Sequence, residues 1–337
     1  MNYKKIASGK IARISRHLQH LPPKSRAMQS DTIHLPIGED NIALMKEAKI
    51  KISTEDDYTL SALYIRPENV RAAVQINAAT GTKKEFYLNF ARYLAQHGLA
   101  VLLYDYRGIG ESAPRHLRGF RADLKTWAGQ DMTTAFDWLK QQHPQQACFI
   151  LGHSMGGQLI GLMHNAIRAD GLILVGSSVG YWPLLPFPSN LMYFVIWYLL
   201  QPVAIRIAGY LPASKIGIGE DLPAGVAKEF RQWCTSPGYL ADFFGKTIQR
   251  QYYDQIKVPL LSLVPTDDNI AGKRSVPPLL RLYQKAHIEE RWLSPQEIGK
   301  QKIGHFGLFS RRFKQQIWPL MLDFVEARLE EKFAEKA

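Results

Sequence analysis

The chain has 337 residues, of which 46% are hydrophobic and 11% aromatic, and its formal net charge is +12. This length and composition predict a globular protein with a substantial core and exclude a disordered or fibrous chain. The positive charge would suit anionic partners such as membrane surfaces or nucleic acid. No basic cluster is interleaved with stacking aromatics, however, so we expect a solvated basic surface and no nucleic-acid partner.

The chain contains two cysteines, Cys148 and Cys234. They lack the spacing of a metal site, and one of them falls inside a predicted strand. This use of cysteine favours a reducing compartment, so we expect a cytoplasmic protein. The sequence shows no cluster of metal-ligating residues and no glycine-rich phosphate loop, and we therefore expect no metal and no organic cofactor.

Residues 1–45 are predicted to form a basic arm ahead of the folded domain. Residues 1–30 contain no acidic residue, and their basic residues are Lys4, Lys5, Lys10, Arg13, Arg16, Lys24 and Arg26. Because the stretch has no continuous apolar segment, it is a poor secretory signal. A basic amphipathic helix in weak contact with a membrane surface is one interpretation. We favour the other, a loosely docked arm.

Between residues 46 and 179, the first part of the predicted core, strands alternate with helices. Two alternating apolar runs broken at Glu55–Asp57 indicate a hairpin. The following runs predict a strand at 72–76, a helix at 86–97, a strand at 99–104, a helix at 125–142, and strands at 147–151 and 172–175. This alternation predicts an α/β fold with a mostly parallel central sheet flanked by helices.

The strand at 147–151 leads into Gly152-His153-Ser154-Met155-Gly156, the pattern of a tight strand-to-helix turn. Such a turn holds its central side chain in a strained conformation at the sheet edge, and the glycines let strand and helix cross closely. The helical pattern that follows places on one face Leu159, Ile160 and Met163. The N-terminus of this helix would direct N–H groups at negative charge beside Ser154. We therefore expect Ser154 to be a nucleophile.

Residues 180–256 interrupt the alternation and are predicted to form an aromatic, helical cap inserted over Ser154. The apolar run Leu191–Leu200 has about half the length that a bilayer-spanning helix needs. We expect the run to be interrupted by Gln201, Pro202 and Arg206, and we interpret it as a buried or lid helix. The residues predicted to line an apolar substrate pocket are Trp182 and Trp197, with ordinary packing inside the cap as the alternative.

Residues 257–337 resume the sheet pattern as the second part of the core, with a strand at 258–264, a helix at 276–285, a strand at 288–293 and a helix at 313–330. A nucleophilic serine needs a base, and the base needs an acid to orient it. Asp267 and Asp268 follow the strand at 258–264, and the pattern alone leaves the choice between them open. His305, between glycines before the last helix, is the predicted base. His153 and His287 are weaker candidates.

Three stretches together resemble the α/β-hydrolase superfamily, and most closely bacterial hydrolases related to serine aminopeptidases and monoglyceride lipases. They are the turn around Ser154, Asp105-Tyr106-Arg107-Gly108-Ile109-Gly110-Glu111-Ser112, and Gly304-His305. The resemblance covers about residues 48–337 apart from the cap. It implies that the Asp105 turn is structural. It also implies that Asp268 is the acid, because Asp268-Asn269-Ile270 fits the register of the family.

The chain departs from this family in the loop after the third strand, where relatives carry His-Gly. Here Ala78-Ala79 occupies that place, followed by Thr80-Gly81. The resemblance implies that the backbone N–H groups of Thr80 and Met155 bind the oxyanion, with Ala79 one position away. Because backbone donors survive side-chain changes, this departure does not exclude catalysis.

The sequence thus predicts a serine hydrolase of carboxylesterase or lipase type, with Ser154, His305 and Asp268 as the catalytic triad. It would cleave an ester of a small to medium apolar substrate through an acyl-enzyme. The same triad could cleave thioesters, peptides or carbon–carbon bonds, and a non-catalytic binding protein on this scaffold is an alternative of another class. The expected partner is a small-molecule acyl substrate, and the oligomeric state stays open.

Overall fold

The computed structural model of the protein describes residues 45–299 and 302–334. The predicted basic arm, apart from its last residue, lies outside the described residues. Two early strands, β1 (Lys46–Ser53) and β2 (Thr59–Arg66), form the predicted antiparallel hairpin, and β2 also pairs antiparallel with β4. The other strands of the main sheet run parallel, namely β3 (Ala72–Asn77), β4 (Leu99–Tyr104), β5 (Ala147–His153), β6 (Gly171–Val175), β9 (Leu260–Pro265) and β10 (Ile288–Leu293).

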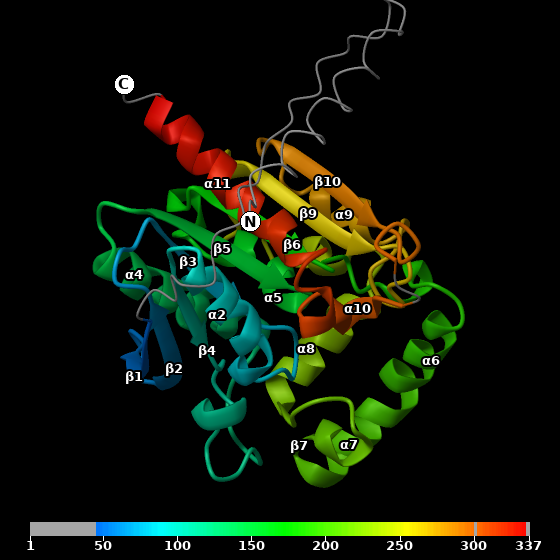
Figure 1. Ribbon diagram of the computed structural model, residues 1–337. Coiled ribbons are helices and arrows are strands. Elements are labelled where there is room, and N and C mark those ends of the chain that lie inside the picture. Colours follow the sequence, from blue (N-terminus) through cyan, green and yellow to red (C-terminus); the bar gives the residue numbers. More distant parts are fainter. Residues whose placement is uncertain (1–44, 300–301, 335–337) are drawn as a thin grey trace, which may run out of the picture. The chain divides into compact units, whose positions relative to one another are not determined.

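These eight strands are arranged in the order β1-β2-β4-β3-β5-β6-β9-β10. Every residue of β3, β4, β5, β6 and β9 is buried, as expected for parallel strands covered on both faces. Helices pack along the sheet (Figure 1): α2 (Leu88–Gln96) against β4, α4 (Thr133–Gln142) against β3, and α11 (Trp318–Ala334) against β6. The α/β class predicted from the sequence is confirmed.

The carboxyl ends of the parallel strands carry the loops of interest. Ser154 follows β5, Asp268 follows β9, and the loop after β3 contains Thr80. His305 lies in the short helix α10 (Gly304–Gly307), between β10 and α11. Because the carboxyl ends of parallel strands share one edge of a sheet, residues far apart in the sequence converge there.

The helix after Ser154 is shorter than predicted. α5 spans only Met155–Gln158, and a 3-10 turn at Ile160–Leu162 replaces its continuation. Glycines weaken a helix here, and a Cβ atom at Gly161 would meet the Tyr253 ring at 2.1 Å. The other helices of the core are α3 (Leu124–Thr126), which continues through a π-helical segment into α4, and α9 (Val276–Leu280).

Residues 180–256 connect β6 to β9, and their boundaries as a cap remain a prediction. They contain α6 (Ser189–Val195), a π-helical turn at Ile196–Leu200, α7 (Gln201–Ala208) and α8 (Ala224–Cys234), together with the two-residue strands β7 (Tyr210–Leu211) and β8 (Leu222–Pro223). α6, the π turn and α7 follow one another directly, and we refer to Ser189–Ala208 as the α6–α7 helix.

The α6–α7 helix corrects the sequence interpretation of this region. It has 20 residues with a mean hydropathy of 1.6, and only 17% of its most apolar 18-residue stretch is buried, so by length and composition alone it could cross a membrane. The predicted interruption at Gln201 and Pro202 does not occur. In the wider π turn the Gln201 N–H donates to Ile196 O, and the proline follows without breaking the helix. The helix is therefore longer than expected and largely exposed, so the interpretation as a buried helix is wrong, while that as a lid helix stays a prediction.

Candidate active site

The backbone at Ser154 is strained. Its φ of 53° and ψ of −117° are rare for a residue with a side chain, and its N–H donates to Val175 O at 2.9 Å. A Cβ atom at Gly152 would lie 2.4 Å from Gly157, whereas one at Gly156 would lie 2.3 Å from Asn77 O. The glycines therefore allow two separate close approaches, one between β5 and α5 and one between α5 and the loop after β3.

His305 and Asp268 form a buried pair. The His305 Nδ1 atom lies 2.7 Å from Asp268 Oδ2, and each residue is only 4% exposed. The other carboxylate oxygen, Oδ1, accepts the N–H groups of Ile270 and Ala271 at 2.7 and 2.9 Å. Three of the carboxylate's four lone-pair positions are thus used, with contacts to both oxygens, which fixes its orientation toward the imidazole.

The neighbouring residue, Asp267, binds a different part of the chain. Asp267 accepts the N–H groups of Ile303 and Gly304, at 2.9 and 3.0 Å, just before His305 in the chain. Its carboxylate therefore ties the loop that carries His305 to the end of β9. The geometry separates the two aspartates that the sequence pattern could not, because Asp268 binds the histidine ring and Asp267 binds the backbone of the two residues before it.

The start of the loop after β3 lies close to α5, since a Cβ atom at Gly156 would lie 2.7 Å from Ala78 O. The Ala79 N–H donates to the Tyr87 hydroxyl at 2.9 Å, so this alternative donor is already engaged. Within residues 45–299 and 302–334, the N–H groups of Thr80 and Met155 donate to no protein acceptor. The contact between Gly156 and Asn77 O brings the two segments together. Backbone N–H groups without protein acceptors are the kind of donor that can bind a developing oxyanion.

A buried network that the sequence did not reveal connects these loops. His153 Nε2 lies 3.1 Å from His305 O, and His153 Nδ1 lies 2.8 Å from the Tyr87 hydroxyl. Because a carbonyl oxygen can only accept, Nε2 carries the proton, and Nδ1 accepts from Tyr87. Burial, followed by the nearby His305, holds the pKa of His153 well below its ordinary value. A neutral His153 thus joins the loop after β3, through Tyr87, to the loop that carries His305.

The two tryptophans predicted to bind substrate lie within the insertion. Trp197 is buried, and its ring centroid lies 5.2 Å from that of Phe230 in α8. Trp182 is partly buried, and its ring packs at a tilt against that of Phe194 of α6, with the centroids 5.0 Å apart. The structure therefore brings both rings into packing contacts inside the insertion. Among the described aromatic contacts, neither ring touches His153 or His305.

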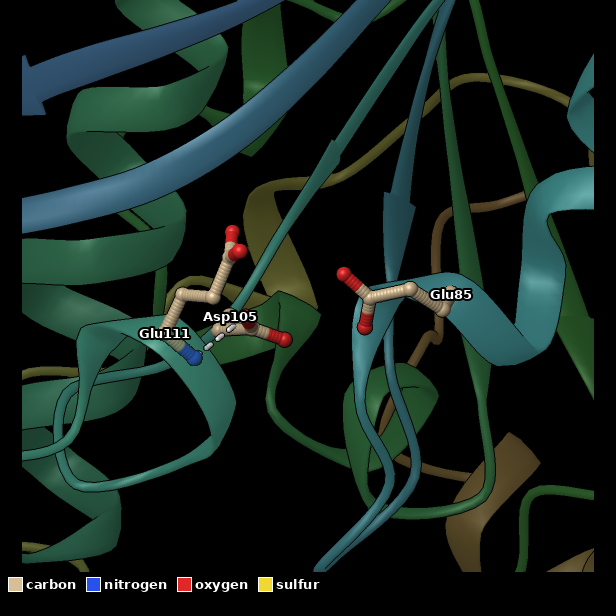
Figure 2. A group of neighbouring side chains, drawn as sticks. All are labelled: Glu85, Asp105 and Glu111. Atoms are coloured by element: carbon tan, nitrogen blue, oxygen red, sulfur yellow. Dashed lines mark hydrogen bonds between the residues drawn. The ribbon is translucent and has the colours of Figure 1, made fainter.

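Three carboxylates lie close enough to hold a cation, and Figure 2 shows Glu85, Asp105 and Glu111. The cation among them is the Lys84 ammonium, whose Nζ lies 2.6 Å from Asp105 Oδ2, 2.8 Å from Glu111 and 3.1 Å from Glu85. Asp105 is buried at the end of β4 and also accepts the N–H groups of Lys84 and Glu111. These bonds agree with a structural role for the Asp105 turn.

The sheet order, the turn at Ser154 and the paired His305 and Asp268 are features of an α/β hydrolase. The model of the serine aminopeptidase S33 family matches residues 68–291, and the chain belongs to that family. The match runs from before β3 into β10 and covers the insertion, so it includes Ser154 and Asp268 but ends before His305.

Relatives of known structure share the fold. A thermostable carboxyl esterase from Bacillus coagulans aligns with a TM-score of 0.59 and 16% identity, covering 85% of this chain and 100% of the esterase. A Pyrococcus furiosus esterase aligns with a TM-score of 0.52 and 16% identity, covering 85% and 91%. In sequence, protein phosphatase methylesterase 1 of Candida albicans is 28% identical over 98 residues. These residues are 28% of this chain, which spans only about a quarter (26%) of that relative.

Proposed function

We propose that the protein is a serine hydrolase that cleaves carboxylic esters of small to medium apolar substrates through an acyl-enzyme. The observation that carries the proposal is the strained Ser154 at the sheet edge where the buried His305–Asp268 pair is assembled. An ester substrate is favoured over a peptide because the relatives with similar folds are named esterases. The family name keeps a peptidase as the second candidate.

The proposed reaction follows from the roles of the site residues. His305 Nε2 takes the hydroxyl proton of Ser154, and Asp268, at 2.7 Å from Nδ1, stabilises the imidazolium. The serine oxygen attacks the carbonyl carbon, and the N–H groups of Met155 and Thr80 bind the oxyanion. The alcohol leaves with the proton from His305. Water, activated by the same histidine, then releases the acid from the acyl-enzyme.

The preferred substrate depends on where residues 180–256 lie relative to Ser154. If residues 180–256 cover Ser154, Trp182 and Trp197 contribute to an apolar pocket for the acyl group. The ratio kcat/KM should then rise from acetyl to butyryl or hexanoyl esters, because each buried methylene contributes about 0.8 kcal/mol. It should fall where the pocket ends. A steady decline from acetyl onward would contradict an apolar acyl pocket.

A fluorophosphonate probe tests the nucleophile. We expect covalent labelling of the wild type and none of Ser154→Ala, with ester turnover reduced by about 10⁶-fold. His305→Ala should cost nearly as much because triad members act as a unit. Circular dichroism serves as the folding control. Labelling that persists in Ser154→Ala would remove this residue as the nucleophile, and an unlabelled wild type would favour a non-catalytic binding protein.

The bond that is cleaved needs a separate comparison. Matched acyl esters, thioesters and aminopeptidase peptides should be compared by kcat/KM on the wild type, with Ser154→Ala as the background. Highest activity on the ester is the expected result. A higher kcat/KM for the peptide or the thioester would be compatible with the proposed triad, but it would contradict an ester as the substrate.

A further inference from the structure

The α6–α7 helix carries apolar side chains on the face that an ordinary surface helix makes polar. One row at every fourth position faces the protein and is buried or partly buried, namely Ser189, Tyr193, Trp197, Gln201 and Ile205. The row two positions further on is exposed, and it consists of Leu191, Val195, Leu199, Val203 and Ile207. A helix on a solvated surface normally places polar residues outward. Here the outer row is entirely aliphatic, and both buried hydrophilic residues belong to the inner row.

The outer row belongs to a larger apolar surface. Of fifteen large hydrophobic residues that are exposed in the described chain, eleven lie between Phe187 and Ile218. Phe187 is 82% exposed, Leu199 58% and Ile207 72%. In Figure 1 α6 and α7 lie at the margin of the ribbon, with α8 on their inner side. Large, contiguous apolar patches on a protein surface typically mark sites that bind a membrane or another protein.

Contacts of the inner row fix which side faces outward. Gln201 Nε2 donates to Ala227 O of α8 at 2.7 Å, and Arg231 Nε donates to Trp197 O. The Trp197 ring packs on Phe230 of the same helix. At the C-terminal end, Arg118 donates to Ile207 O at 3.0 Å. Rotation of the helix to bury its outer row would break each of these contacts.

The charges around this surface are those that an anionic surface would attract. No acidic residue occurs from Gly171 to Gly219, and the basic residues of that stretch are Arg206 and Lys215, both exposed. The first acids after it are already engaged, since Glu220 lies 3.3 Å from Lys83 and Asp221 binds the Ser214 hydroxyl at 2.6 Å. Cations beside an apolar helical face are characteristic of helices that lie in a membrane interface.

We propose that the α6–α7 helix is a monotopic membrane anchor that lies in the interface of a bilayer containing anionic lipids. The outer row and Phe187 would enter the acyl-chain boundary, while Arg206, Lys215 and Arg118 would meet the phosphate groups. The helix does not span the bilayer. Its inner row is bound to α8, and β7 pairs with β8 two residues after the helix ends, so the C-terminal end stays in the fold. This inference does not depend on the proposed reaction.

The test is flotation of the full-length protein with phosphatidylcholine vesicles that contain phosphatidylglycerol, and with vesicles of phosphatidylcholine alone. We expect the wild type to float with the anionic vesicles and more weakly with the neutral ones. The triple variant Leu199→Ser, Val203→Ser, Ile207→Ser should bind at least tenfold more weakly, because it removes buried hydrocarbon. Leu199→Ser alone should weaken binding severalfold, and it serves as the second variant if the triple variant misfolds.

The matched control removes exposed apolar groups elsewhere, with Ile167→Ser and Ile288→Ser, and should bind as the wild type does. Deletion of residues 1–30 should leave the loss caused by the triple variant unchanged. Alkaline carbonate should release the bound protein. The proposal is overturned if the wild type does not float, if the triple variant floats equally, or if carbonate fails to extract the protein, which would indicate a spanning helix. A dimer that the triple variant dissociates, without vesicle binding, would assign the surface to a second copy.

Discussion

Around the candidate site polar side chains are buried and paired, whereas along the α6–α7 helix large apolar side chains face outward. Asp268, His305 and His153 each have hydrogen-bond partners at 3.1 Å or less. Burial of such groups is costly unless every partner is supplied, so the loops at the carboxyl ends of the strands are fixed in one arrangement. The outer row of the helix is exposed, at 40–72% for each side chain, and such exposed apolar side chains lower the solubility of a protein.

The difference between the two regions lies in what keeps each one in place. The site is held by directional hydrogen bonds, so loss of one of them would misplace the groups that react. The helix is held through one inner row, which leaves its outer face available without affecting the site. Substitutions in the two regions should therefore produce different kinds of effects, and the predictions below use that contrast.

The largest expected effect is a loss of activity on substitution of the two aspartates at the candidate site. Asp268→Asn should lower kcat by about 10⁴-fold, because the amide cannot stabilise the imidazolium. Asp267→Asn should cost less, since it retains one acceptor for the N–H groups of Ile303 and Gly304. Steady-state kinetics on a short-chain ester would measure both. Equal and small losses would contradict the assignment of Asp268 as the acid.

The next effect compares the two faces of the α6–α7 helix. Trp197→Ala removes a buried ring from the inner row and should destabilise the fold by about 3–5 kcal/mol. Leu199→Ser, two positions away on the outer row, should change stability by less than about 0.5 kcal/mol. Urea unfolding measures both. Similar losses would show that the outer row is also packed, which would undermine the membrane proposal.

The same variant examines the predicted substrate role of Trp197. At a temperature where Trp197→Ala is folded, a shifted optimum of acyl chain length would indicate that the ring lines the pocket. An unchanged optimum with lower stability would leave it as packing between α6–α7 and α8.

Much of the core could be predicted from apolar patterning, because its strands are buried along their whole length. The strands at Leu99–Tyr104 and Ile288–Leu293 have the predicted bounds. The failures have tertiary causes. α5 stops early because Tyr253, far along the chain, packs at Gly161. The α6–α7 helix continues through Pro202 because a π turn precedes it, and periodicity does not reveal such a turn.

The site shows the same limit. Order along the chain and the family resemblance selected Ser154, Asp268 and His305, and the structure brings the last two together at 2.7 Å. The supporting bonds of Asp267, Tyr87 and His153 join loops that are distant in sequence. Their residue types carry no local pattern, so only the fold reveals them. The position of His153 beside the nucleophile was the one available signal, and sequence reasoning treated it as a weak candidate for the base.

The smallest expected effect concerns pH. Acid should lower the free energy of unfolding through His153 in the core, and it should leave membrane binding by the α6–α7 helix unchanged. Burial holds the pKa of His153 well below its ordinary value of 6.5, so the folded protein keeps the ring neutral while the unfolded chain takes up a proton. Its contribution to stability is therefore complete above pH 6.5 and decreases as the pH falls below it. The slope cannot exceed about 1.4 kcal/mol per pH unit for one group.

Other groups titrate around the same window and must be separated from His153. The pKa of His143 is also lowered by burial, and burial raises that of Asp131 to about 7, with the opposite effect on stability. Hydrogen bonds to Arg107 and Lys84 lower the pKa values of Asp56 and Glu111 to about 2, so these two carboxylates lose their contributions only at lower pH.

The measurement is therefore a difference. Urea unfolding of the wild type and of His153→Gln between pH 7.5 and 5 should show a stability that falls more steeply with acid in the wild type, because only there does the unfolded state gain this proton. Glutamine can still donate to His305 O and accept from Tyr87. Parallel slopes would mean that His153 is not neutralised by folding. The α6–α7 helix has no carboxylate or histidine, so vesicle binding of the folded protein should not change across this range.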